Sequence, residues 1–321
     1  MQAEIRENTS MKESWSVIHP VRPEDSAAMA ILRSTVAAMK GKLEGSAARG
    51  AFDGIMERVP APEGVSFKDD TVGGISGWWV VPAQVRKGAA ILHLHGGWFH
   101  WGTALAFRHL VGHIAMSAGV DAFIPDYRLA PEHPFPAAVK DAEACYRGLL
   151  DRGIRRIALT GDSAGGNLAL VLLSIASAQA GSPRSAPVGA AVLSPVTDMA
   201  LTGESFETRA EADPYFIKSQ VAALVRSYLV DTDSKNSLAS PLYGDLTGLP
   251  AIRVHVGDDE VLLDDSRRYV ERAVAAGVDA KLDVWMGMPH GFANGVGKLQ
   301  AANEALRAIG GFLSDRLEGA R

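Results

Sequence analysis

One serine of this chain lies in a setting that suits a catalytic nucleophile. Ser163 is the centre of Gly161-Asp162-Ser163-Ala164-Gly165, directly after the strand-like run Arg156–Thr160 and directly before an apolar helical pattern. A turn this tight between a strand and a helix excludes bulky residues two positions before and after the serine, and it pushes the hydroxyl into the open. Glycine is frequent in this chain, so the pattern gains its weight from the strand and the helix around it. Ser163 is therefore the predicted nucleophile.

A base for this serine is expected late in the chain. A serine hydroxyl is a poor nucleophile near neutral pH, and in folds with this kind of turn the base follows both the serine and the acid. His290 fits that order, because it lies in a loop after the last predicted strand. The other histidines precede the acid position, lie within strands or cluster at the first loop. We therefore predict His290 as the base.

Donors for a developing oxyanion are expected where the strand Ala89–His95 ends. This strand runs directly into Gly96, Gly97 and Trp98. Backbone N–H groups at that place, together with the amide of the residue after the nucleophile, form an oxyanion hole in folds of this type. We predict that Gly97, Trp98 and Ala164 supply the donors and that Gly96 forms the turn.

The rest of the chain supplies the elements that must position these residues. From about residue 65, short apolar runs alternate with amphipathic stretches of helical length, a pattern typical of a mostly parallel sheet covered by helices. The predicted strands are Gly77–Val81, Ala89–His95, Asp121–Pro125, Arg156–Thr160, Gly189–Ser194, Ala251–Val256 and Lys281–Trp285. The predicted helices lie near residues 103–118, 136–151, 164–179, 264–276 and 298–317.

Two segments break this alternation and are predicted to form one helical cap. They are residues 1–45, with an amphipathic helix around Ser26–Met39, and residues 198–230; neither contains a convincing strand. The catalytic core would then comprise residues 46–197 and 231–321. Peripheral helices without a role in binding are the alternative. The aromatic residues that we consider as substrate contacts are Trp98, Phe99, Phe206, Tyr215 and Phe216.

Composition excludes several classes of protein. The chain has 321 residues, of which 47% are apolar and 21% charged, as in ordinary globular proteins. With 32 Lys and Arg against 37 Asp and Glu, its net charge of −5 gives no positive field for nucleic acid. The chain has no apolar run of 18 residues, and its single cysteine, Cys145, requires no oxidising compartment. We expect a cytoplasmic protein that does not insert into membranes.

No metal or cofactor is expected. His93 and His95 could begin a metal site, but glycines follow at the positions where a metallo-hydrolase pattern needs an aspartate and a further histidine. A phosphate-binding loop at Gly161–Gly166 is also excluded, because no Gly-Lys-Ser/Thr follows.

Four motifs in the same order resemble the hormone-sensitive-lipase-like esterases, the bacterial family IV carboxylesterases of the α/β-hydrolase fold. They are His95-Gly96-Gly97 followed by an aromatic residue, Tyr127–Ala137 (YRLAPEHPFPA), Gly161–Asn167 (GDSAGGN) and His290-Gly291-Phe292. The resemblance covers roughly residues 60–321. It implies cofactor-free hydrolysis of carboxylic esters with short to medium acyl chains, and a cap built partly from the N-terminus.

Two departures from the family pattern affect the predicted site. The family's third glycine is Trp98 here, so the shape of the acyl pocket does not carry over. The family places its acid in Asp-Pro-Leu-x-Asp, whereas this chain reads Gly257-Asp258-Asp259-Glu260 and continues to Asp264 and Asp265. Spacing favours Glu260 as the acid, and residue type favours Asp259, which stays open as the alternative.

These features together predict a serine carboxylesterase that acts on a small ester through an acyl-enzyme. An amidase or a thioesterase would use the same machinery. A non-catalytic receptor on the same fold is the alternative from another class, although retention of Ser163 and His290 argues against it. By resemblance alone, a homodimer through the outer strand Lys281–Trp285 is also considered.

Overall fold

The chain folds around one mostly parallel sheet. The computed structural model describes residues 15–179 and 186–318, and within them nine strands join in the order β1-β9-β8-β7-β6-β4-β5-β3-β2. The strands are β1 (Ser16–His19), β2 (Val65–Val72), β3 (Ile75–Pro82), β4 (Ala89–Leu94), β5 (Asp121–Pro125), β6 (Arg156–Asp162), β7 (Ala190–Leu193), β8 (Ile252–Gly257) and β9 (Ala280–Trp285). Only the pairs β2–β3 and β3–β5 are antiparallel. The predicted α/β-hydrolase architecture is confirmed.

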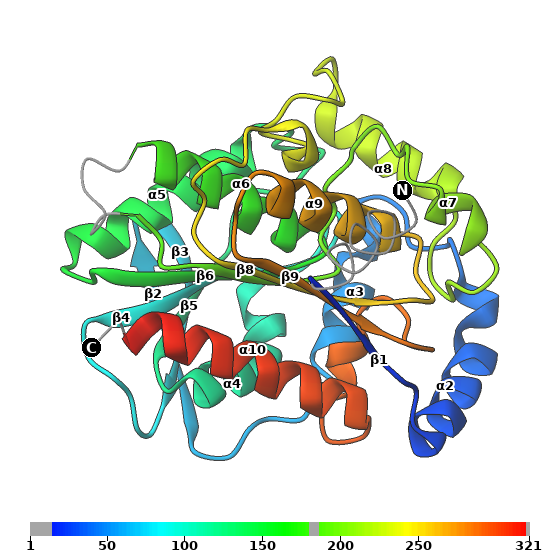
Figure 1. The fold of residues 1–321 in the computed structure, drawn as a ribbon, viewed down its shortest axis with the longest axis horizontal. Helices are drawn as coiled ribbons and strands as arrows, with labels where there is room; N and C mark the ends of the chain where they lie inside the picture. The colour runs from blue at the N-terminus through cyan, green and yellow to red at the C-terminus, as the bar shows by residue number, and fades with distance from the viewer. Residues whose placement is uncertain (1–14, 180–185, 319–321) are drawn as a thin grey trace, which may run out of the picture.

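Helices cover both faces of the sheet. The described ones are α2 (Pro23–Val36), α3 (Arg49–Met56), α4 (Ala104–Ala118), α5 (Ala137–Asp151), α6 (Ala164–Ala178), α7 (Ser205–Thr208), α8 (Lys218–Leu229), α9 (Leu263–Ala275) and α10 (Gln300–Glu318), with 3-10 turns η1 (Ala37–Met39), η2 (Ser46–Ala48), η3 (Pro241–Tyr243) and η4 (Phe292–Gly295). In Figure 1, α5, α6 and α9 lie on one face, and α4 and α10 lie on the other. Each face has its own core of buried apolar side chains.

The apolar pattern accounts for the central elements. β4 is buried at all six positions, as its nearly continuous apolar sequence indicates for a strand covered on both faces. α4 begins where the Thr103 side chain accepts a hydrogen bond from the Ala106 amide, and it ends at Gly119 in the left-handed conformation. The five predicted helices all begin and end within two residues of α4, α5, α6, α9 and α10.

Both edges of the sheet differ from the prediction. Residues 1–45 do contain a strand, because β1 pairs in parallel with β9, so Lys281–Trp285 is not the outer strand. A dimer interface formed by Lys281–Trp285 as the outer strand is therefore contradicted, since β1 covers that edge of the sheet. At the other edge lies β2, which the prediction missed. β1 was not predicted because it is only four residues long, and β2 was not predicted because its sequence SFKDDT is polar. Side chains of both edge strands are partly exposed, so neither strand needs an apolar sequence.

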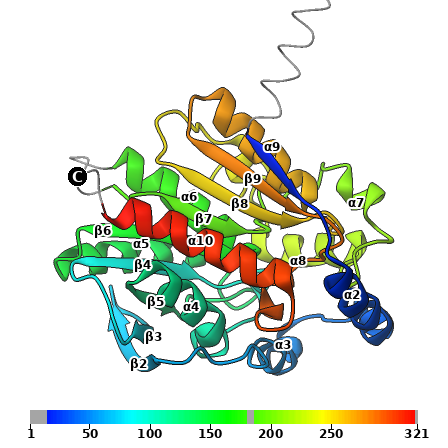
Figure 2. The ribbon, with the colours of Figure 1, turned by 60° about the horizontal axis from the view of Figure 1, so that its bottom comes forward.

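The two segments outside the alternating pattern contact each other. Lys40 Nζ donates to the Ala210 carbonyl at 2.6 Å, and the Gly41 amide donates to the Tyr215 carbonyl at 2.8 Å. In both views α2, α7 and α8 gather at one end of the sheet (Figures 1 and 2). None of the helices in the described ranges is long and apolar enough to cross a lipid bilayer.

Candidate active site

Ser163 occupies a strained turn between β6 and α6. Its φ of 55° and ψ of −119° lie outside the region that most residues adopt, and the residue is buried. The backbone around it is crowded, because a Cβ at Gly165 would lie 1.9 Å from the Leu94 carbonyl oxygen. The Ser163 amide donates to the Leu193 carbonyl at 2.8 Å, which fixes the turn against the end of β7. The geometry is that of a turn that presents a serine hydroxyl from a rigid backbone.

His290 and Glu260 are brought together at the carboxyl ends of β9 and β8. Nδ1 of His290 lies 2.8 Å from Oε2 of Glu260. The other carboxylate oxygen accepts two further hydrogen bonds, from the Ser194 hydroxyl and the Gly257 amide, both at 2.7 Å. Glu260 is fully buried. A buried carboxylate fixed in this way orients the imidazole and stabilises its charged form.

The surroundings of His290 favour its protonated form. Burial lowers the pKa of His290, but the hydrogen bond and charge of Glu260, with smaller contributions from the charges of Asp213 and Asp162, outweigh burial. The pKa of His290 therefore lies above its ordinary value. An imidazole with a raised pKa is suited to accept a proton and to return it later.

The two aspartates that precede Glu260 face other partners. Asp259 Oδ2 forms an ion pair with the Arg33 guanidinium of α2 at 2.5 Å. Burial and the neighbouring charge of Asp258 raise the pKa of Asp259, although Arg33 opposes them. The Asp258 carboxylate accepts a hydrogen bond from the Gly287 amide. Of these three carboxylates, the one that contacts His290 is Glu260.

The loop after β4 carries the predicted oxyanion donors. Gly97, Trp98 and Phe99 all have positive φ, at 118°, 52° and 63°. The Gly96 amide donates to the Asp162 carboxylate at 3.0 Å and is thereby occupied. The amides of Gly97 and Trp98 have no acceptor among residues 15–179 and 186–318, which leaves them free for an oxyanion.

Of the predicted substrate contacts, Phe216 lies against His290, and Trp98 and Tyr215 lie against Phe216. The Phe216 ring packs edge-on against both Trp98 and His290, with centroid distances of 5.5 Å and 5.2 Å. Tyr215 is the next ring in this group, 6.4 Å from Phe216. Trp98 is almost fully buried. These contacts form an apolar wall beside His290.

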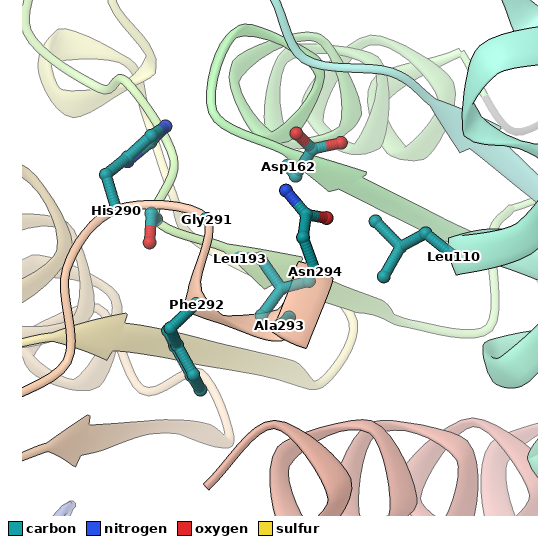
Figure 3. Close-up of a pocket in the computed structure, with 9 residues that line it drawn as sticks. Leu110, Asp162, Leu193, His290, Gly291, Phe292, Ala293 and Asn294 are labelled. Carbon is teal, nitrogen blue, oxygen red and sulfur yellow. The ribbon is translucent and has the colours of Figure 1, made fainter. Parts of the chain in front are cut away.

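Phe99 and Phe206 lie in different surroundings. The Phe99 ring stacks face to face on Tyr228 of α8 at 3.9 Å, and Phe206 of α7 is 1% exposed. Neither lines the small pocket beside His290, which Figure 3 shows between the end of β6 and η4. Asp162 and His290 line that pocket, and the Asn294 side chain points toward Asp162.

His93 and His95 are core histidines in this structure. Nδ1 of His95 donates to the Gly96 carbonyl at 2.8 Å, and its ring stacks on Tyr127 at 4.2 Å. Nδ1 of His93 lies 2.8 Å from the Thr160 hydroxyl. No group of three His, Cys, Asp or Glu side chains in the described part of the chain is arranged to hold a metal ion.

Two residues around the site were missed by the sequence reasoning. Ser194 donates to Glu260, and Asp213 accepts hydrogen bonds from the amides of Phe216 and Val261. Ser194 ends a predicted strand, a position that places a side chain at the carboxyl edge of the sheet. No spacing signal separates Asp213 from the chain's many other acidic residues.

The parallel sheet and the strained turn at Ser163 are typical of an α/β hydrolase. Comparisons with known proteins identify the family. A model of the alpha/beta hydrolase fold matches residues 91–294. An acetyl-hydrolase of Streptomyces hygroscopicus is 40% identical over 68% of this chain and 73% of that protein, and an esterase of Acinetobacter venetianus is 33% identical over 83% and 88%. The crystal structure of EstE5 aligns with a TM-score of 0.85 and 38% identity, covering 93% of this chain and all of the other. An esterase of the bacterial hormone-sensitive lipase family aligns with a TM-score of 0.84 and 38% identity, covering 92% and 99%.

The chain belongs to the α/β-hydrolase family and, within it, to the bacterial hormone-sensitive-lipase-like esterases. It is a carboxylic ester hydrolase. The family resemblance stated from four sequence motifs is thus confirmed.

Proposed function

We propose that this protein is a serine carboxylesterase in which Ser163, His290 and Glu260 act as nucleophile, base and acid. The observation that carries the proposal is the 2.8 Å contact between His290 Nδ1 and the buried Glu260 carboxylate. That contact leaves Nε2 of His290 as the atom that exchanges protons with the nucleophile. Asp259 has its own partner in Arg33, which supports Glu260 over the alternative acid.

The proposed reaction proceeds through an acyl-enzyme. Ser163 Oγ attacks the ester carbonyl carbon while its proton passes to Nε2 of His290, and the carbonyl oxygen becomes an oxyanion. The tetrahedral intermediate collapses as the C–O bond to the alcohol breaks, and His290 gives its proton to the leaving oxygen. Water, deprotonated by His290, then attacks the acyl carbon. The bond to Ser163 Oγ breaks, His290 returns the proton to this oxygen, and the carboxylic acid is released.

Backbone amides of Gly97, Trp98 and Ala164 are proposed to stabilise the oxyanion. Ala164 is the first residue of α6, so its amide has no partner within the helix and lies at the positive end of the helix dipole. Gly96 takes a supporting role in this scheme, because its amide is bonded to Asp162. Donors fixed in position before the reaction stabilise the developing charge without reorganisation.

The preferred substrate is proposed to be a small ester of short to medium acyl chain. The Phe216 ring packs against His290, and the Trp98 ring packs against Phe216; bulky rings at these positions support a limit on acyl length. Residues 1–45 and 198–230 are proposed to act together as a cap over a core of residues 46–197 and 231–321. The contacts of Lys40 and Gly41 with Ala210 and Tyr215 support this grouping, while residues 1–14 lie outside the described ranges.

The test is labelling and loss of the nucleophile. One equivalent of a fluorophosphonate is expected to attach at Ser163, located by peptide mass spectrometry. Ser163→Ala is expected to lower kcat by about 10³-fold or more toward aryl esters from acetate to dodecanoate. Ser174→Ala is the matched control, because the Ser174 hydroxyl donates to the Leu170 carbonyl of its own helix. Wild-type rates in Ser163→Ala would refute the proposal, and faster turnover of an anilide or a thioester would redirect it to those substrates.

A further inference from the structure

A buried carboxylate outside the proposed triad connects the loop of the acid to the aromatic wall. Asp213 has no exposed surface. Its Oδ1 accepts hydrogen bonds from the amides of Tyr215 and Phe216, at 2.8 Å and 3.0 Å. Its Oδ2 accepts one from the Val261 amide at 2.9 Å, directly after Glu260 in the chain. One carboxylate therefore binds both the segment that carries Phe216 and the loop that carries Glu260.

Further contacts join the same two segments. Arg209 Nε donates to the Asp258 carbonyl at 2.7 Å, and Arg33 bonds both the Ala212 carbonyl and the Asp259 carboxylate. These three contacts come from two partly buried arginine side chains, whereas the hydrogen bond from Val261 to Asp213 is buried. A buried hydrogen bond to a charged acceptor is not weakened by competing water, and among these contacts the one to Asp213 is the buried one.

Phe216 transmits this arrangement to the base. Its ring lies against His290 on one side and Trp98 on the other. Glu260 holds the same imidazole from its Nδ1 side. A shift of the 213–216 segment relative to the Glu260 loop would therefore change the position of the imidazole relative to its acid. Misplacement of a catalytic group by about 1 Å can cost as much as about 10²-fold in rate.

We propose that Asp213 is a positioning residue that fixes Phe216 and the Glu260 loop as one unit around His290. The proposal rests on the proposed triad and extends it to a residue that contacts neither Ser163 nor the predicted oxyanion donors. Asp213 acts through Phe216 and Val261, and its charge also bears on His290.

The charge of Asp213 affects the pKa of His290, which a purely structural role would leave unchanged. The groups that face His290 electrostatically are Glu260, Asp213 and Asp162, and all three raise its pKa against the effect of burial. Removing the charge of Asp213 is therefore expected to lower the pKa of His290. Because the base must be neutral to accept the serine proton, the acid limb of the pH–rate profile would shift to lower pH.

The experiment compares Asp213→Asn with Asp25→Asn. An asparagine can still accept from Tyr215 and Phe216, but its amide nitrogen would face the Val261 N–H, so the connection to the acid loop is lost. Asp25 of α2 is the matched control: it is also a buried carboxylate that accepts two backbone hydrogen bonds, but its donors are Gln300 and Ala301 at the start of α10.

The expected result is a fall in kcat of about 10-fold or more in Asp213→Asn, with KM within about threefold. The His290 pKa, followed by NMR of the imidazole and by the acid limb of kcat/KM, should fall in this variant and stay unchanged in Asp25→Asn. An unchanged His290 pKa together with a kcat within twofold of wild type would overturn the proposal.

A second variant keeps the proposal testable if Asp213→Asn does not fold. Phe216 is partly exposed, so Phe216→Leu is expected to be tolerated. It should lower kcat by about fivefold or more, and a kcat within twofold of wild type would refute the role given to Asp213. The NMR titration requires no turnover. A chain that hydrolyses no ester would therefore refute the esterase proposal, while the His290 pKa would still decide the role of Asp213.

Discussion

Asp259 forms an ion pair with Arg33, and this contact joins the loop of the proposed acid to helix α2, which is more than 200 residues away in sequence. Arg33 also donates to the Ala212 carbonyl. One arginine therefore contacts both the 198–230 segment and the loop that carries Glu260. Asp259, the neighbour of the proposed acid, thus binds the N-terminal segment. Adjacent carboxylates in one loop therefore have separable roles, and substitution can distinguish them.

Replacing Glu260 and Asp259 by their amides should affect catalysis in one case and stability in the other. Glu260→Gln should lower kcat by at least about 10²-fold, because His290 loses the acceptor that fixes its tautomer and stabilises its charge. Asp259→Asn should keep kcat within several-fold and lower the melting temperature, because it weakens a partly buried ion pair. Steady-state kinetics and thermal unfolding of both variants check this. The reverse order of kcat losses would make Asp259 the acid.

The pH dependence of the wild-type enzyme follows from the environment of His290. Its pKa lies above the ordinary value of about 6.5, since Glu260, Asp213 and Asp162 outweigh burial. Only the neutral imidazole accepts the serine proton, so kcat/KM should rise with pH through a single step centred above that value. A pH series with a substrate whose own ionisation does not change measures it. A step centred below about 6 would contradict the arrangement of charges described here.

The loop that carries the proposed oxyanion donors requires glycine at position 97. Its φ of 118° is unfavourable for any other residue, and an added Cβ would lie 2.2 Å from the Trp101 carbonyl oxygen. Gly97→Ala should therefore displace the donors and lower kcat by about 10²-fold or more. Gly311→Ala is the control, because nothing lies near that position on α10. The control should retain kcat and be slightly more stable, by about 0.5 kcal/mol. Equal kinetics in both variants would exclude Gly97 from the oxyanion hole.

Local pattern was sufficient for most of the fold and for part of the site. The strand before Ser163, the helix after it and the position of His290 after β9 all follow from short stretches of sequence, and the structure has them. Contacts between distant segments were not predictable. β1 consists of four residues that pair with the distant strand β9, and Asp213 differs from other acidic residues in what the fold places around it. Periodicity reports burial along one element and does not report which elements meet.

The predicted limit on acyl length depends on Trp98, which stands where the family has glycine. Its ring is almost fully buried and packs against Phe216, whose ring also contacts His290. Glycine adopts the φ of 52° found at this position without strain, so Trp98→Gly should keep the loop and remove the ring. An indole buries about 150–250 Å² of surface, and the vacated space should admit longer chains.

The measurement is kcat/KM for aryl esters from acetate to dodecanoate. Wild-type enzyme should prefer acetate to hexanoate, and Trp98→Gly should shift the optimum toward longer or bulkier acyl groups. Loss of stability is also expected, at about 3–5 kcal/mol for a buried aromatic ring, so assays belong well below the melting temperature. Phe99→Leu provides the control, since its ring stacks on Tyr228 and its loss opens space there instead. If Trp98→Gly keeps the wild-type chain-length profile, or if Phe99→Leu shifts it equally, the indole does not set the acyl limit.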